Sequence, residues 1–196
     1  MKKQGSLFSI IFAIFCFCAC NEQTGVLAKE TSRTDKNILT DNAVWKEEVP
    51  ITLFVVRHAE KQTGTNPSLT ENGKQRAIDL AHFLENIPID AIYSSNYKRT
   101  EETVMPTATQ KNLAITTYDP GQLSKVASDL LAIQASKTVL LVGHSNTNPD
   151  LINILTKTKD YPHLTEKQYD DIFMLRVYSN LENTEVLHLN YGAKSD

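Results

Sequence analysis

The chain has 196 residues, of which 41% are hydrophobic and 22% charged, a composition typical of a globular protein rather than a disordered or fibrous one. This length suits one domain with appendages, and a net charge of -3 excludes the basic excess that nucleic-acid binders carry. All three cysteines, Cys16, Cys18 and Cys20, lie at the N-terminus, so they describe that segment rather than the rest of the chain.

The N-terminus is predicted to be a lipoprotein signal peptide. Two lysines precede an apolar run over residues 7–19, which is too short to cross a bilayer as a helix. The run ends in Phe17-Cys18-Ala19-Cys20, which resembles a bacterial lipobox, a signal cut before its last cysteine. We expect residues 1–19 to be removed and Cys20 to anchor the protein by lipid at the bacterial cell envelope, on the periplasmic face or outer membrane. A plain signal peptide is the alternative.

The remaining chain is predicted to consist of a tether and one domain. Residues 20–46 are polar and have no sustained hydrophobic period, which indicates a flexible tether. Residues 47–196 are numerous enough for one core. Since Cys20 would be the last remaining cysteine, cysteine catalysis and thiolate metal sites are excluded. We expect the protein to be a monomer.

Within the domain, apolar β-branched runs alternate with residues at helical spacing. In chain order we predict a strand over 51–56, a helix from the N-cap Thr70 to Leu84, a strand over 91–93, a helix over 97–109, a strand over 113–118, a helix over 123–130, a strand over 138–142, a helix over 149–155, and a final strand pair over 172–178 and 185–189. This alternation predicts a three-layer α/β/α sandwich with a largely parallel central sheet.

Two of the buried strands end in histidine. The first runs into Arg57 and His58, and the strand over 138–142 runs into His144. Ligands of open α/β sheets bind at the carboxyl ends of the strands, so these side chains are expected to meet there. Arg99 is expected near a helix N-terminus, and both features favour phosphate.

Four segments together resemble the histidine phosphatase (phosphoglycerate mutase-like) superfamily, and they occur in its order. They are the nucleophile motif Val55-Val-Arg-His-Ala-Glu60, the first helix start Leu69-Thr-Glu-Asn-Gly-Lys-Gln-Arg-Ala77, the second arginine segment Ser94-Ser-Asn-Tyr-Lys-Arg99-Thr-Glu-Glu-Thr103, and the second histidine motif Val142-Gly-His-Ser145. The resemblance implies a histidine phosphatase-like fold and a phosphomonoesterase that requires no metal or other cofactor.

The same resemblance implies roles for individual residues. His58 would attack phosphorus and form a phosphohistidine, while Arg57, Arg99 and a protonated His144 would bind the phosphoryl group. Further phosphate contacts are expected from nearby loop residues, namely Lys61, Thr63 and Asn146. The substrate would be a phosphorylated small molecule or a phosphohistidine protein.

The proton donor for the leaving group is left open by the sequence. Asp119 follows the third strand and Glu60 lies two residues beyond His58, so both are candidates. Without a donor, the chain could instead be an inactive phosphate-binding lipoprotein. A serine hydrolase is a further alternative, because Ser145 follows a buried strand in a sequence close to G-x-S-x-G, although Thr147 replaces the second glycine.

Overall fold

The computed structural model describes residues 49–133 and 135–195, which form four helices and six strands. The predicted signal peptide and all but the last residues of the stretch before Ile51 lie outside the described residues. In chain order the elements are β1 (Ile51–Arg57), α1 (Glu71–Phe83), β2 (Ala91–Ser95), α2 (Lys98–Lys111), β3 (Ile115–Tyr118), α3 (Leu123–Leu131), β4 (Thr138–Gly143), α4 (Thr147–Thr156), β5 (Asp171–Val177) and β6 (Glu185–Asn190).

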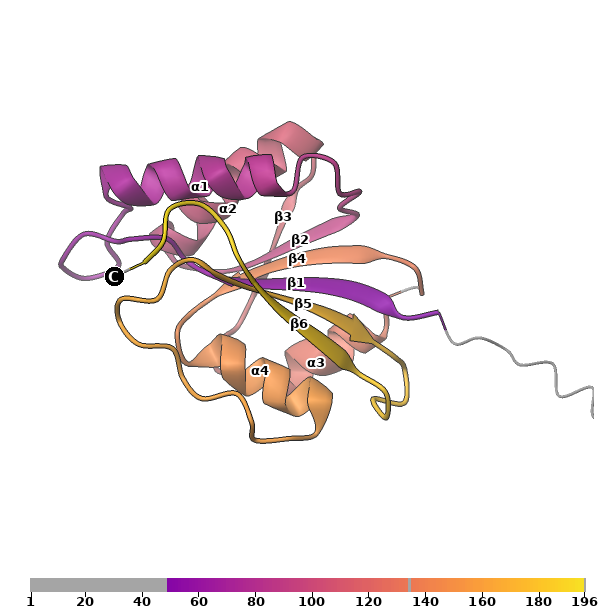
Figure 1. Ribbon diagram of the computed structural model, residues 1–196. Coiled ribbons are helices and arrows are strands. Elements are labelled where there is room, and N and C mark those ends of the chain that lie inside the picture. The colour runs from indigo at the N-terminus through magenta and orange to yellow at the C-terminus, as the bar shows by residue number, and fades with distance from the viewer. Residues whose placement is uncertain (1–48, 134, 196) are drawn as a thin grey trace, which may run out of the picture. The chain divides into compact units, whose positions relative to one another are not determined.

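The strands form one sheet in the order β3-β2-β4-β1-β5-β6. The first four strands of this order are parallel to one another, whereas β5 and β6 are antiparallel additions. Helices α1 and α2 cover one face of the sheet, and α3 and α4 cover the other (Figure 1). The predicted three-layer sandwich with a largely parallel sheet is therefore confirmed.

Strand β1 contributes to the cores on both sides of the sheet. Leu53 and Val55 pack into the core beneath α3 and α4, while Phe54 and Val56 pack into the core beneath α1 and α2. Both faces of a central parallel strand are covered by helices, which explains why its sequence is apolar without alternation. The same holds for β4, whose residues from Val139 onward are all buried.

Two elements begin two residues away from the predicted position, and the other elements begin within one residue of it. Helix α4 begins at Thr147 rather than at Pro149, so Pro149 lies within its first turn. A proline is tolerated there because the first N–H groups of a helix have no partner within the helix. Strand β3 begins at Ile115 rather than at residue 113. There Asn112 takes a left-handed conformation with φ 52° and Leu113 N–H donates to Ala108 O, so Leu113 closes α2 instead of opening the strand.

The chain changes direction between β1 and β4, which are neighbours in the sheet. After β1 the chain passes to α1 on one face, and after β4 it passes to α4 on the opposite face. The two connections diverge at the carboxyl ends of these strands, which is where open α/β sheets bind their ligands. The residues that follow β1 and β4 lie at this point of the sheet.

Candidate active site

The register of β1 and β4 places the two histidines side by side. Arg57 pairs with Gly143, and the next N–H along, that of His58, donates to Gly143 O at 2.9 Å. The imidazole rings of His58 and His144 consequently lie with their centroids 5.5 Å apart at an angle of 66°. The expectation that these histidines meet at the sheet edge is thus met by the geometry.

One ring nitrogen of His58 is held by its own backbone. Its Nδ1 lies 2.8 Å from Ala59 O, and a carbonyl can only accept, so Nδ1 carries the proton. Nε2 therefore keeps a lone pair. Burial lowers the pKa of His58 to about 3, and the positive charges of Arg57 and Arg99 add to this effect against the opposing Ala59 hydrogen bond. His58 is a neutral imidazole at physiological pH.

His144 is held on both sides by hydrogen bonds. Its Nδ1 accepts from Arg99 Nη2 at 3.3 Å, because a guanidinium has only donors, and its Nε2–H then donates to Ser95 Oγ at 2.9 Å. Burial lowers the pKa of His144 to about 4, with Arg99 and Arg57 as further causes. The protonated His144 expected from the sequence is therefore corrected to a neutral one in this charge environment. A phosphate dianion would counter the arginine charges and raise this pKa.

Arg57 is buried and is positioned by a segment far along the chain. Its Nη1 donates to Thr165 O at 2.6 Å and to Gln168 O at 3.0 Å, and its Nη2 pairs with Glu166 Oε2 at 3.3 Å. Its guanidinium carbon lies 4.2 Å from the centre of the Tyr169 ring. These contacts leave the buried Nε–H without a partner among the described residues.

Arg99 reaches the same cluster from the first turn of α2. Its guanidinium carbon lies 4.4 Å from the centre of the Tyr97 ring, and its buried Nε–H also has no partner within residues 49–133 and 135–195. Burial and the charge of Arg57 lower the pKa of Arg99, although Tyr97 opposes the shift. The buried Arg57 and the half-buried Arg99, each with an unpaired and buried Nε–H donor, form beside a neutral imidazole a site suited to an anion such as phosphate.

Neither predicted proton donor has a free carboxylate. Both oxygens of Glu60 are taken by Arg76, at 2.8 to 3.0 Å, and Arg76 is itself buried. The exposed Asp119 accepts from Gly121 N at 2.8 Å and from Gln122 Nε2 at 2.9 Å. Asp119 therefore stabilises the turn that leads into α3, and Glu60 anchors α1 to the loop after β1.

The other predicted phosphate contacts lie in the loops around the cluster. The backbone of Lys61 pairs with Leu69 in an isolated bridge, and Thr63 is exposed in the turn between them. Asn146 is exposed at the N-cap position of α4, where its side chain makes no capping hydrogen bond. Among the described residues, none of these three side chains forms a hydrogen bond or an ion pair with the histidines or arginines of the cluster.

The serine hydrolase alternative finds little support in the surroundings of Ser145. Both ring nitrogens of the adjacent His144 are taken, by Ser95 and Arg99, so His144 cannot serve as its base. The backbone carbonyl of Ser145 accepts from Leu164 N at 2.9 Å and thereby holds the segment that reaches Arg57.

Two groups of site residues escape sequence reasoning. Ser95 fixes the tautomer of His144, and the segment 165–169 covers Arg57 and places the Tyr169 ring 6.1 Å from that of His58. The segment lies in an irregular, polar stretch without any motif, so its sequence carries no signal. For Ser95 a signal exists, because it ends a strand beside β4, but it does not distinguish a positioning residue from an ordinary serine.

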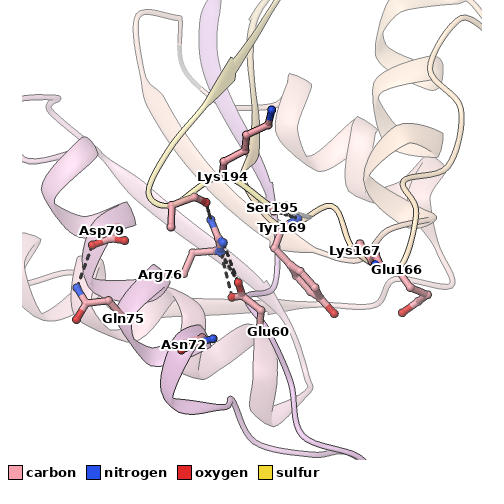
Figure 2. A pocket seen from close by; sticks show the side chains of 11 residues that line it. Glu60, Asn72, Gln75, Arg76, Asp79, Glu166, Lys167, Tyr169, Lys194 and Ser195 are labelled. Carbon is pink, nitrogen blue, oxygen red and sulfur yellow. Dashed lines mark hydrogen bonds and ion pairs between the residues drawn. The ribbon is translucent and has the colours of Figure 1, made fainter.

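A cavity of about 430 Å³ opens beside the cluster and is shown in Figure 2. Glu166 and Tyr169 line it, as does the Arg76–Glu60 pair, and the C-terminal residues Ala193, Lys194 and Ser195 complete its wall. Among the described residues, no group of three histidine, cysteine, aspartate or glutamate side chains could hold a metal ion. The described helices include none that is long and apolar enough to cross a membrane.

The family model of the histidine phosphatase superfamily (branch 1) matches residues 53–120, which hold His58 and Arg99. A curated relative, phosphoserine phosphatase 1 of Hydrogenobacter thermophilus, is 38% identical over 77 residues, which are 35% of this chain and 36% of that protein. The chain thus spans only about a third of that relative's length.

Solved structures extend the similarity over the whole described domain. The protein histidine phosphatase SixA complexed with tungstate is 19% identical with a TM-score of 0.62, over 71% of this chain and 96% of that one. A putative alpha-ribazole-5'-P phosphatase from Escherichia coli is 14% identical, also with a TM-score of 0.62, over 71% and 96%. The described residues thus share the fold of these solved structures, and residues 53–120 carry the similarity to the histidine phosphatase superfamily.

Proposed function

We propose that the protein is a metal-independent phosphomonoesterase that works through a phosphohistidine on His58. The observation that carries the proposal is the state of His58 itself. Ala59 O holds its Nδ1–H, so the lone pair of Nε2 is free for attack beside Arg57 and Arg99, whose buried Nε–H donors are unpaired among the described residues. A neutral nucleophile within a fixed cationic cluster is what attack on a phosphate dianion requires.

In the first step, the phosphoryl group lies beside His144 and against Arg57 and Arg99, whose charges neutralise its equatorial oxygens. His58 Nε2 forms a bond to phosphorus while the bond from phosphorus to the leaving oxygen breaks, and the leaving oxygen takes that electron pair and a proton. In the second step a water oxygen attacks phosphorus, the P–N bond breaks towards His58, and inorganic phosphate departs. The arginines supply throughout the positive charge that a metal ion supplies in other phosphatases.

The substrate is either a phosphorylated small molecule or a phosphohistidine protein. The names of similar proteins include both a protein histidine phosphatase and a phosphoserine phosphatase. The cavity beside Tyr169 could receive the leaving group of either class. A panel of phosphomonoesters and phosphohistidine peptides, assayed with wild type and His58→Ala, separates the two.

The test of the proposed function is His58→Ala in the purified full-length protein. We expect at least about a 10³-fold loss of p-nitrophenyl phosphate hydrolysis and loss of an acid-labile phosphoprotein, because the nucleophile is gone. His82→Ala is the matched control, since His82 is exposed on α1, and it should keep wild-type activity.

Three outcomes would contradict the proposal. Undiminished hydrolysis by His58→Ala would exclude His58 as nucleophile, and loss of activity with Ser145→Ala alone would indicate a serine hydrolase. Phosphate binding without any turnover by the wild type would indicate an inactive binding protein.

A further inference from the structure

The proposed reaction needs a proton for the leaving oxygen, and the two carboxylates predicted for it are engaged elsewhere. Glu60 is paired with Arg76, and Asp119 is bound within its own turn. The structure brings a third carboxylate to the cluster. Glu166 Oε2 lies 3.3 Å from Arg57 Nη2, and the Glu166 side chain is 79% exposed, so it is free to move relative to Arg57.

Glu166 lies between the phosphate-binding cluster and the cavity. Glu166 and Tyr169 both line the cavity (Figure 2). Glu166 also pairs with Arg57, and the Tyr169 ring packs on Arg57 and lies 6.1 Å from the His58 ring. A phosphomonoester bound to Arg57 with its leaving group in this cavity would therefore place the leaving oxygen near Glu166.

Binding of the substrate would place a second anion beside Glu166. A phosphate dianion takes up the positive charge of Arg57 and puts a like charge next to the carboxylate, and two adjacent anions favour a proton held between them. The other charged residues that line the cavity are Lys167 on the same segment, the paired Glu60 and Arg76, Asp79 and Lys194. Glu60 and Glu166 both raise the pKa of Tyr169, after the larger effect of its burial and against Arg57.

We propose that Glu166 is the catalytic residue that protonates the leaving group, an inference that rests on the proposed function. As His58 Nε2 bonds to phosphorus, the P–O bond breaks and its electron pair passes to the leaving oxygen. That oxygen takes the proton from the Glu166 carboxyl group, so the alcohol leaves neutral and Glu166 becomes a carboxylate. Once the leaving group has departed, Arg57 again pairs with the Glu166 carboxylate.

The experiment is a leaving-group series with Glu166→Gln, which keeps the shape of the side chain but cannot donate an acidic proton. The substrates are p-nitrophenyl, phenyl and ethyl phosphate, whose leaving oxygens need increasing help from an acid. We expect kcat/KM to fall about 10²-fold or more for ethyl phosphate and less than about 10-fold for p-nitrophenyl phosphate, a selective loss typical of a missing general acid. The burst of phosphohistidine with the nitrophenyl ester should persist.

The variants Glu60→Gln and Asp119→Asn test the two rival proton donors. The matched control is Glu182→Gln, because Glu182 is an exposed carboxylate in the turn between β5 and β6. An equal loss on all three esters would mean that Glu166 acts only by holding Arg57, and no loss or a gain on ethyl phosphate would also overturn the proposal. A selective loss in Glu60→Gln or Asp119→Asn instead would assign the donor there. If Glu166→Gln behaves like wild type while His58→Ala is inactive, only the assignment of Glu166 fails.

Discussion

At the scale of single residues, the candidate site depends on which ring nitrogens carry protons. Ala59 O determines this for His58, and Arg99 and Ser95 determine it for His144. Ser95 also donates to Thr100 Oγ1 at 3.2 Å, so its remaining lone pair faces His144 Nε2–H. Each imidazole therefore has one defined tautomer before any phosphate arrives, and the Nε2 lone pair of His58 is available without a proton shift.

Ser95→Ala should impair turnover more than folding. The substitution leaves the buried Nε2–H of His144 without its acceptor, which costs about 1–3 kcal/mol of free energy. The ring can avoid this cost by changing tautomer or by rotating. Because about 1.4 kcal/mol corresponds to a tenfold change in rate, we expect kcat to fall roughly 10-fold or more. Steady-state kinetics measures this, and nitrogen-15 NMR of the His144 ring should show a mixture of tautomers.

Ser94→Ala is the control for Ser95→Ala, because Ser94 is equally buried but its hydroxyl donates to Ser95 O at 3.0 Å rather than to a histidine. This variant should keep kcat and the single His144 tautomer. Equal effects of the two substitutions on kcat, or an unchanged tautomer in Ser95→Ala, would show that Ser95 does not position His144.

The two site histidines should make stability depend on pH in a defined direction. The pKa of His58 is lowered to about 3 and that of His144 to about 4, from about 6.5 in an unfolded chain. Between these values the unfolded state binds more protons than the folded one, so stability is highest above about pH 6.5 and is lost as the pH falls. Each histidine can contribute at most about 1.4 kcal/mol per pH unit in this range.

Urea unfolding at pH 7, 6 and 5 measures this dependence, in a range where most carboxylates remain ionised. The slope of the unfolding free energy against pH should become flatter in His58→Gln and flatter again when His144→Gln is added. A slope that the double substitution leaves unchanged would mean that other groups cause the acid sensitivity. By the same pKa values, protonation of His58 should not limit kcat/KM above about pH 5.

At the scale of secondary-structure elements, the sequence predicts the strands and helices whose hydrophobic pattern is local. The continuous apolar runs identify β1 and β4, and since parallel neighbours end at one edge of the sheet, His58 and His144 could be expected to meet. The helices follow from their spacing, although their ends do not. Whether Leu113 closes α2 or opens β3 depends on the left-handed Asn112, which no apolar pattern reports.

The remaining parts of the site depend on contacts between distant segments. Thr165 is separated from Arg57 by 108 positions, and its contact is made by a backbone carbonyl, which any residue type could supply. The pairing of Glu60 with Arg76 joins a loop to a helix and follows from no fixed spacing, so Glu60 could be taken for a free acid. Sequence reasoning therefore found the histidines and arginines that gather at the sheet edge, but could not find the residues that hold them in place.

At the scale of the whole molecule, the predicted lipid anchor concerns residues outside the described ones and decides where the domain works. The apolar run over 7–19 and the lipobox-like end at Cys20 predict that the domain is exported and attached by a diacylglycerol. Attachment by acyl chains adds about 0.8 kcal/mol per buried CH₂ group, so the two chains of a diacylglycerol are sufficient for stable membrane binding. The candidate site contains no cysteine, and its chemistry should not depend on the anchor.

Cys20→Ser should therefore abolish lipid attachment without impairing the chemistry of the domain. Expressed in a bacterium with radiolabelled palmitate, the wild type should be labelled and partition into detergent, whereas Cys20→Ser should be unlabelled and retain its uncut N-terminus. Cys18→Ser is the matched control and should behave like the wild type, because Phe17 is a poor residue before a cut site. Labelling that survives in Cys20→Ser, or that disappears in Cys18→Ser, would contradict the assignment. An unlabelled wild type with a cut N-terminus would identify a plain signal peptide. Equal kcat values for the lipidated wild type and the unlipidated Cys20→Ser protein would show that the anchor determines location alone.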